Sequence, residues 1–404
     1  PYKLSEDIIG IGFKTADKIA RSMGIELDSP HRGMAGTKYV LSQAANNGHT
    51  YLPKEELINS AAALLGVDTQ LVENAIVSLA MNQSITIEET EEHTAVYLQP
   101  FYVAESNISK ALIELAMTDM PIPVDNLDEL IYDLQKQEKI ILAQNQKEAV
   151  IESLKNGVLV ITGGPGTGKT TTVNCIIKLF EQLGAEVMLA APTGRAAKRL
   201  SETTGREAKT IHRLLEYGYS GDGELDFFQK DEDDPLDADV VIVDEMSMVD
   251  VLLMNHLLKA IVPGTRLILV GDVDQLPSVG PGNVLRDIIN SGLVKVIRLI
   301  EIFRQAQESM IVLNAHRINR GEFPQLNVKG KDFFLDRRQS PKEILDTIVD
   351  LICRRIPGFG PYDPLKDIQV LSPMKKGLVG VNNLNAELQK VLNPPKPGKK
   401  EKAS

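Results

Sequence analysis

The chain has 404 residues, enough for two to four domains, and 43% of them are hydrophobic. Its formal net charge of −11 argues against a surface that binds nucleic acid everywhere, but not against a local basic groove. No apolar run approaches the ~20 residues that span a bilayer, and no signal peptide is visible, so we expect no membrane partner. Cys175 and Cys353 lie far apart and the six histidines show no metal-ligand spacing, so we expect no disulfide framework and a cytoplasmic location.

The first segment, residues 1–28, has the pattern of two short helices around a glycine turn. Gly10 and Gly12 form the turn, and the helix after it carries Ala16 and Ala20 on one side. This pattern predicts a helix-hairpin-helix, in which N–H groups at a helix N-terminus contact a DNA phosphate. A plain helical hairpin that contacts no DNA is the alternative, and the sequence does not decide between the two.

Residues 29–105 predict a helical, winged-helix-like unit, and residues 106–140 predict connecting helices with a break at 120–123. Whether the winged-helix-like unit contacts DNA or only packs is left open by its sequence. Its expected elements are helices at 36–46, 53–65 and 68–81 and strands at 84–89 and 94–98.

From residue 141 apolar strands alternate with helices, which predicts a doubly wound parallel α/β sheet over residues 141–320. Ligands of such a sheet bind at the carboxyl ends of its strands. The strands are expected at 158–162, 186–191, 240–244, 266–270 and 294–298. An acidic, glycine-rich insert at 222–239 is expected to be a solvated loop.

Residues 321–404 predict a second, partial α/β domain after a glycine and proline break. The tail at 393–404 is basic and proline-rich, and we expect it to be disordered. The other expected elements are a helix at 341–354, a loop at 357–364, a strand at 368–371 and a helix at 381–392.

The sequence GGPGTGKT, which starts at Gly163, indicates a phosphate-binding loop. It follows the apolar run 158–161 and precedes a helical pattern, and this strand–loop–helix context is the one that the motif requires. Lys169 is expected to reach the β- and γ-phosphates of ATP, and the Thr170 hydroxyl to hold Mg²⁺. The expected nucleotide-binding residues are Gly164, Pro165, Gly166, Thr167, Gly168, Lys169, Thr170 and Thr171.

Two further strand ends carry polar side chains. Asp244 and Glu245 follow an apolar strand, and we expect Asp244 to bind Mg²⁺ and Glu245 to activate the attacking water. A merely capped strand end is the alternative for this pair. Gln275, after the strand at 266–270, is a candidate sensor of the γ-phosphate.

In combination these segments resemble the superfamily-one DNA helicases of the RecD-like group, in the order of that family. Gln146 is similar to the glutamine of the family that reads adenine, and Arg304 to the arginine that reaches the γ-phosphate. Residues 189–202 and 210–215 resemble the segments that contact single-stranded DNA, and residues 368–385 resemble the start of a second RecA-like motor domain. The resemblance implies catalytic roles for Lys169, Glu245, Gln275 and Arg304.

Hydroxyl and cationic groups in these segments suit phosphate contacts, so the resemblance implies a DNA-binding set. A solvated helix face is the alternative for Arg195, Lys198 and Arg199, and we favour DNA contact because of the phosphate loop. The expected DNA-binding residues are Thr193, Gly194, Arg195, Arg199, Thr210, His212, Pro277 and Gly282, with Gly10 and Gly12 of the helix-hairpin-helix.

The resemblance implies an ATP-dependent 5′→3′ DNA helicase of recombination or repair, built from RecA-like P-loop domains. Its implied partners are single-stranded DNA and a single-stranded-DNA-binding protein or recombination factors. The chain begins without Met and shows neither of the last two motifs of the family, so we expect a chain truncated at both ends that hydrolyses ATP poorly. A nucleotide-gated DNA-binding module without turnover, and a RecD-type subunit of a recombination nuclease complex, are the alternatives.

Overall fold

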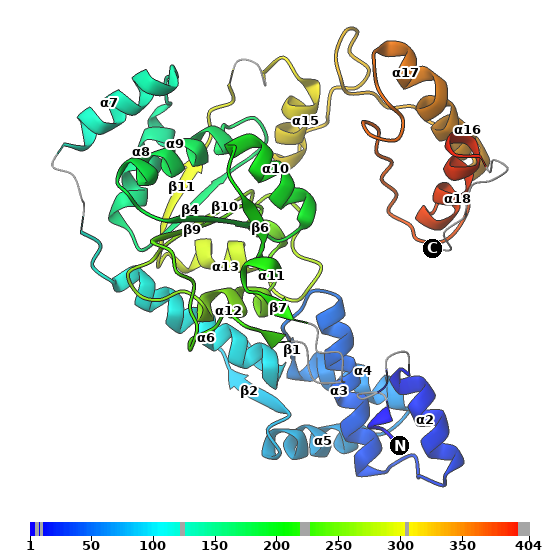
Figure 1. Ribbon diagram of the computed structural model, residues 1–404. Coiled ribbons are helices and arrows are strands. Elements are labelled where there is room, and N and C mark those ends of the chain that lie inside the picture. The colour runs from blue at the N-terminus through cyan, green and yellow to red at the C-terminus, as the bar shows by residue number, and fades with distance from the viewer. Residues whose placement is uncertain (5–7, 9–10, 122–125, 219–226, 304–306, 395–404) are drawn as a thin grey trace. The chain divides into compact units, whose positions relative to one another are not determined.

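The computed structural model describes residues 1–4, 8, 11–121, 126–218, 227–303 and 307–394 (Figure 1). The chain forms two compact units, Pro1–Pro324 and Gln325–Ser404. The larger unit holds a six-stranded sheet and the smaller N-terminal sheet, and the second unit is helical in its described part.

The centre of the first unit is a six-stranded parallel sheet in the order β11-β4-β10-β9-β5-β6 (Figure 1). The five predicted strands are all present, with ends that differ by one residue or so, and the doubly wound fold is confirmed. β6, at the edge beside β5, was not predicted. The strands are β4 (Val158–Gly163), β5 (Val187–Ala191), β6 (Ala208–Thr210), β9 (Val240–Val243), β10 (Arg266–Gly271) and β11 (Lys295–Leu299).

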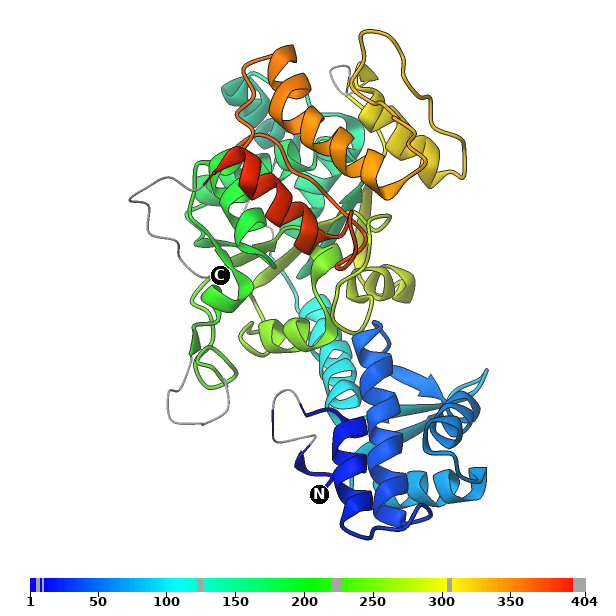
Figure 2. The same cartoon turned by 90° about the vertical axis from the view of Figure 1, so that its right-hand side faces the viewer.

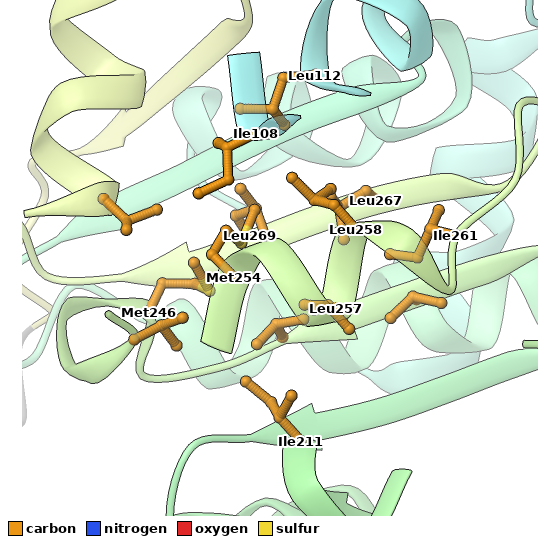
Figure 3. Packing of buried hydrophobic residues seen from close by; sticks show 14 of the residues in the cluster. Ile108, Leu112, Ile211, Met246, Met254, Leu257, Leu258, Ile261, Leu267 and Leu269 are labelled. Carbon is orange, nitrogen blue, oxygen red and sulfur yellow. The ribbon is translucent and has the colours of Figure 1, made fainter. Parts of the chain in front are cut away.

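Both faces of this sheet are covered by helices, because its strands are apolar on both sides. Val158 and Val160 belong to one buried cluster, whereas Leu159 and Ile161 belong to the other, and all four are at most 1% exposed. Figure 3 shows part of the first cluster, in which α12 packs over β10. The helices of the first face are α6 (Gln99–Met117), α11 (Ile211–Leu214), α12 (Val251–Lys259) and α13 (Val284–Ser291), and those of the second are α7 (Leu127–Glu138), α8 (Gln144–Lys155), α9 (Lys169–Gln182) and α10 (Gly194–Thr204).

The N-terminal part combines helices with a three-stranded antiparallel sheet in the order β1-β3-β2 (Figure 2). The strand β1 was not predicted, and the helix expected from residue 36 already begins at Pro30. The helix α6 runs without a break through the boundary expected between residues 105 and 106. The elements are α2 (Phe13–Ser22), α3 (Pro30–Asn46), β1 (Tyr51–Pro53), α4 (Lys54–Leu65), α5 (Thr69–Met81), β2 (Ile85–Glu89) and β3 (Thr94–Leu98).

Arg32 fastens the helix after the glycine turn to the rest of the N-terminal part. Its guanidinium is 4% exposed and donates to Asp17 on α2 and to the carbonyl oxygens of Leu27 and Leu65. Burial raises the pKa of Asp17, but hydrogen bonds from Arg32 and Tyr2 outweigh burial and leave this pKa below its ordinary value. A buried cation with four acceptors holds α2 in one orientation.

The acidic insert is only partly the solvated loop that we expected. Residues 219–226 lie outside the described part, but Phe228 in β8 (Phe227–Phe228) pairs with β7 (Tyr217–Gly218) and stacks on His256, with ring centroids 4.4 Å apart. Leu236 is 5% exposed and its N–H donates to Ala260. Apolar residues therefore dock both arms of the insert on the sheet domain.

The second unit departs most from its prediction. Its described residues, 325–394, contain no strand, so the strand expected at 368–371 is wrong. A strand needs a neighbour for its N–H and C=O groups, and no other described segment of this unit is extended beside it. The helix at 381–392 is confirmed. The elements are α16 (Pro341–Asp350), a π-helical turn η2 (Leu351–Arg355), α17 (Ile356–Phe359), which replaces part of the expected loop, and α18 (Val381–Leu392).

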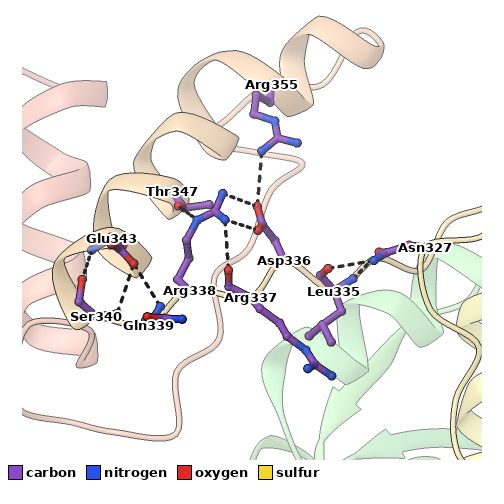
Figure 4. Close-up of polar contacts among 10 residues, drawn as sticks. All are labelled: Asn327, Leu335, Asp336, Arg337, Arg338, Gln339, Ser340, Glu343, Thr347 and Arg355. Carbon is purple, nitrogen blue, oxygen red and sulfur yellow. Dashed lines mark hydrogen bonds and ion pairs between the residues drawn. The ribbon is translucent and has the colours of Figure 1, made fainter.

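Polar contacts define the start of the second unit (Figure 4). The Arg338 guanidinium donates to Asp336 and to the Thr347 hydroxyl, and Ser340 caps α16 through a reciprocal contact with Glu343. Residues 395–404 of the tail predicted at 393–404 lie outside the described residues.

No single helix in the described ranges is long and apolar enough to cross a membrane. The bent pair α4 and α5 passes that test together, by length and composition alone.

Candidate nucleotide-binding site

The phosphate loop connects the end of β4 to the first residue of α9. Gly166 and Gly168 have φ of +77° and +80°, values that favour glycine. A Cβ built on Gly168 would lie 2.4 Å from Gln146 Nε2 and 2.7 Å from the Phe303 ring. Gly168 is therefore required by its backbone conformation and by the two side chains packed against it.

The carbonyl groups of the loop point toward protein partners. Gly163 and Gly164 accept from Lys169 Nζ at 2.5 and 3.2 Å, and Gly166 accepts from the Phe303 N–H at 3.2 Å. Gly168 accepts from Gln146 Nε2 at 3.3 Å. The carbonyl oxygens of the loop thus already accept hydrogen bonds, from Lys169 and Thr167 of the loop itself and from Gln146 and Phe303 outside it.

The N–H groups of the same loop remain for a ligand. Within the described residues, the N–H groups of Gly166, Thr167 and Gly168 donate to no protein acceptor, and the first N–H groups of α9 have no partner within the helix. Such N–H groups at a helix N-terminus attract anions. The residues present therefore fit a bound phosphate chain.

Two carboxylates flank the loop at the end of β9. The Asp244 carboxylate accepts the Glu245 N–H at 2.9 Å, and Glu245 has a φ of +55°, unusual for a residue with a side chain. Burial raises the pKa of Asp244, and Lys169 and Arg199 partly offset this effect. Burial and the charge of Asp244 together raise the pKa of Glu245. Strained backbone and shifted carboxyl groups at one strand end are typical of a functional site.

These groups line a cavity of about 760 Å³ at the carboxyl ends of the strands. All of the predicted nucleotide-binding residues lie here together with Asp244, Glu245 and Gln275, whose Nε2 is 3.4 Å from Asp272 Oδ2. Gln146 lines the cavity too, although its Oε1 already accepts the Ala143 N–H at 3.0 Å. The lining includes Gln146, Gly164, Pro165, Gly166, Thr167, Gly168, Lys169, Thr170, Thr171, Asp244, Glu245 and Gln275.

Arg199 was predicted as a DNA contact, but the structure places it in this cavity. Ala196, Arg199, Leu200 and Thr203 form one stripe of α10 along the lining, at helical spacing. The Arg199 charge acts on both carboxylates and lowers their pKa values, which partly offsets the effect of burial. Its position also suits contact with a phosphate, and DNA contact by Arg199 stays a prediction.

Sequence reasoning missed Phe303, which lines the cavity, and Asp272, which contacts Gln275 beside the lining. Phe303 covers Gly168 and lines the cavity, and Asp272, 4% exposed, follows β10 and holds the Asp274 N–H at 3.1 Å. Asp272 follows an apolar strand just as Asp244 does, and this signal could have found it. Phe303 adjoins Arg304, which lies outside the described residues, as does Gly10.

The predicted DNA-binding threonines cap helices. Thr193 Oγ1 accepts the Ala196 N–H at 3.2 Å, and Thr210 Oγ1 accepts the Arg213 N–H at 3.1 Å. Each hydroxyl proton remains for a phosphate, so the capping role and the DNA role are compatible. The caps also give these positions a structural reason that the sequence did not reveal.

His212 and Gly282 likewise have structural partners. The His212 ring packs on Tyr217 and Phe228, with centroids 5.6 and 5.8 Å apart. The Gly282 N–H donates to the Gly48 carbonyl at 3.0 Å, and a Cβ there would lie 2.5 Å from Val251. Gly282 thus joins the sheet domain to the N-terminal part. DNA contact by Gly12, Gly194, Arg195 and Pro277 stays a prediction.

The metal prediction depends on few protein ligands. The described residues contain no group of three or more His, Cys, Asp or Glu that could hold a metal ion. Thr170 and Asp244 supply one hydroxyl and one carboxylate, and Mg²⁺ in phosphate sites usually takes its other ligands from phosphates and water. The residues present therefore fit a Mg²⁺ that is bound together with a nucleotide.

The parallel sheet, the phosphate loop and the acidic strand end define a P-loop domain of the RecA-like class. The AAA domain family matches residues 146–281, and the family described as the ATP-dependent RecD2 DNA helicase HHH domain matches residues 1–51. The ATP-dependent RecD2 DNA helicase of Deinococcus radiodurans is 35% identical over 402 residues, 96% of this chain and 53% of that protein.

Two other matches are more limited. The RecBCD enzyme subunit RecD of Mycobacterium tuberculosis is 37% identical over 235 residues, 52% of this chain and 38% of that protein. The solved Pif1 helicase of Candida albicans is 25% identical, with a TM-score of 0.33 and coverage of 46% of each chain. The chain is similar to the RecD-like helicases over most of its length, as its motifs predicted, and it spans about half the length of the RecD2 helicase it matches.

Proposed function

We propose that this chain carries the ATP-binding motor domain of a DNA helicase that moves 5′→3′ along single-stranded DNA in recombination or repair. The phosphate loop supports this most directly, because its free N–H groups face a cavity that also holds Asp244, Glu245 and Gln275. Similarity to the RecD-like helicases supports the DNA substrate, and the polarity is carried over from that resemblance.

The residues have distinct parts in the proposed reaction. Lys169 would leave the carbonyls of its own loop and bind the β- and γ-phosphates. Thr170 and Asp244 would hold Mg²⁺, which neutralises phosphate charge when bound. The Glu245 carboxylate would orient a water molecule and accept its proton, and its raised pKa makes it a stronger base than an exposed carboxylate.

Other residues would supply the sensing and DNA-binding parts. Gln275 and Arg304 would respond to the γ-phosphate, and Gln146 would read adenine. Thr193, Arg195, Thr210 and His212 would contact the DNA strand. A single-stranded-DNA-binding protein or recombination factors would be further partners.

Two other functions use the same site. A nucleotide-gated DNA-binding module would bind ATP and DNA without turnover. A subunit of a recombination nuclease complex is supported by the likeness to the RecBCD enzyme subunit RecD. The match of residues 1–51 to the RecD2 helix-hairpin-helix domain favours the stand-alone helicase over the subunit.

The test is ATP binding and hydrolysis by this chain, with and without single-stranded DNA. We expect Mg²⁺-dependent nucleotide binding that Lys169→Ala weakens, and DNA affinity that falls as salt rises. Hydrolysis stimulated by DNA supports the motor and excludes the gated module, whereas binding of both ligands without turnover fits the module and also the poorly hydrolysing motor expected from the sequence. A chain that binds no nucleotide would refute the proposal.

A further inference from the structure

We propose that His316 is a positioning residue of the phosphate loop, through which helix α15 sets the affinity for nucleotide. α15 spans Met310–Asn319 and follows the sheet in sequence. The inference rests on the proposed function, because it concerns the loop that would bind ATP. None of the helicase motifs that identified the site includes His316.

The first observation is a direct contact between the histidine and the loop. His316 Nε2 lies 3.1 Å from the carbonyl oxygen of Pro165. This oxygen can only accept, so Nε2 carries the proton and donates. Pro165 has no N–H, and its carbonyl is therefore its one backbone hydrogen-bonding group.

The second observation is the space that the ring occupies. A Cβ built on Gly164 would lie 2.6 Å from His316 Cε1, 3.3 Å from Nδ1 and 3.4 Å from Nε2. Gly164 is not among the glycines with positive φ, so its backbone conformation does not demand glycine. The three atoms nearest to the built Cβ all belong to the histidine, and the ring explains why no side chain fits at Gly164.

The third observation is that α15 is firmly placed. Asn314 is fully buried and Met310 is 4% exposed, while Ser309 caps the helix by accepting the Val312 N–H at 3.3 Å. After the helix, Arg317 Nε donates to the Phe323 carbonyl at 2.9 Å. A capped helix anchored by two buried side chains gives the histidine ring a fixed support.

The same C-terminal segment of the first unit holds the loop at two neighbouring carbonyls. His316 Nε2 donates to the Pro165 carbonyl, and the Phe303 N–H donates to the Gly166 carbonyl. With these carbonyls turned outward, the N–H groups that follow are turned toward the cavity. The loop is therefore ordered before the nucleotide arrives, which reduces the conformational entropy lost on binding.

A double-mutant cycle tests the inference with a fluorescent ATP analogue and Mg²⁺ as the probe. His316→Ala removes one hydrogen bond and is expected to weaken binding about fivefold. In His316→Gln the amide N–H can replace the imidazole donor, so we expect most of the affinity to return. Asn319→Ala, on the same helix and exposed, is the matched control and is expected to bind like the unmodified chain.

The glycine supplies the second arm of the cycle. Gly164→Ala is expected to weaken binding about tenfold or more in the presence of His316, and about twofold when His316 is already alanine, because the clash is gone. Thermal melting of each variant shows that it folds.

The role of His316 would be overturned if Gly164→Ala weakened nucleotide binding equally with and without His316. It would also be overturned if folded His316→Ala bound the probe with unchanged affinity. Neither result would affect the proposed function. If the unmodified chain binds no probe, the proposed function fails first and the inference falls with it. The two failures are therefore distinguishable.

Discussion

The two units of the chain bury their apolar side chains to different extents. In the first unit the strands beside the nucleotide cavity are buried on both faces, and Leu269 in β10 is 0% exposed. In the described part of the second unit, Ile352 and Leu384 are the buried large apolar residues, whereas Leu371 and Phe359 are each 84% exposed. Neighbouring strands bury each other's side chains, and a segment without such neighbours leaves its own exposed.

This difference teaches where a substitution will matter. A side chain in the first unit has many partners that cannot rearrange, so its loss leaves a cavity or an unpaired group. A side chain of the same type in the second unit mostly faces water. Matched substitutions in the two units therefore test this difference, because the loss of unfolding free energy can be compared directly.

The largest effect is expected from core leucines. Leu269→Ala should lower the free energy of unfolding by about 2–5 kcal/mol, because it leaves a cavity between β10 and α12. Leu371→Ala, the matched control, should change it by about 0.5 kcal/mol or less. Urea unfolding measures both, and similar losses in the two variants would contradict the contrast between the units.

The next effect is expected from matched arginines. Arg32→Ala should destabilise the N-terminal part by about 3 kcal/mol, since it leaves Asp17 and two carbonyls without their buried donor. Arg338→Ala removes an ion pair whose partners are 38% and 37% exposed, and should cost about 1 kcal/mol or less. Equal costs in denaturant titrations would show that burial is not what distinguishes these pairs.

The Arg32 effect should also depend on pH. The folded pKa of Asp17 is lowered, so its contribution to stability is present above the ordinary aspartate pKa of about 3.9 and is lost as pH falls through the lower folded value. The stability difference between the unmodified chain and Arg32→Ala should therefore shrink on acidification. It should not vanish, because the bonds to Leu27 and Leu65 do not titrate. A difference that grows toward acid would contradict this linkage.

A smaller effect in free energy is expected at the phosphate loop. Lys169→Ala should weaken binding of a Mg²⁺-bound ATP analogue about 10- to 100-fold, because it removes a charged donor to phosphate. Lys376→Ala, an exposed lysine of the second unit, should bind the analogue like the unmodified chain. Fluorescence titration measures both, and full affinity in folded Lys169→Ala would exclude the assigned role.

The smallest effect is expected from two arginines of α10. Arg199→Ala should weaken nucleotide binding without DNA by about threefold to tenfold, because its charge lies in the cavity. Arg195→Ala should leave nucleotide binding unchanged, weaken binding to single-stranded DNA, and reduce the slope of that affinity with salt by about one phosphate contact. If Arg199→Ala instead weakens DNA binding and leaves nucleotide binding unchanged, Arg199 contacts DNA and not the nucleotide.

Local patterns made much of the fold predictable. The run 158–161 is apolar at every position, which indicates a strand buried on both faces, and the structure confirms it as β4. The edge strand β6 was missed because three residues are too few to show an alternation of apolar and polar side chains. They are extended because they pair with β5. The run at 368–371 was wrongly predicted as a strand. Its residue types favour an extended backbone, but no described segment pairs with it.

The same division applies to the candidate site. Gly168, Lys169 and Thr170 were recognisable because their spacing within one loop is the motif itself. Arg199 was predicted to contact DNA, and only the structure shows that it also lines the nucleotide cavity, because the sequence of α10 does not say which side of the helix faces the cavity. Asp272 could have been found from its place after an apolar strand, whereas Phe303 enters the site only through the packing after β11.

The sequence by itself determined the phosphate loop, the acidic strand end and the class of fold, because each depends on residues close together in the chain. Backbone conformation and the alternation of apolar residues are local properties, and a short segment carries them. The tertiary structure alone decided that Arg199 faces the nucleotide cavity and that His316 reaches Pro165, 151 residues away along the chain. Contacts of that kind depend on how whole helices pack on the sheet, and no local pattern encodes them.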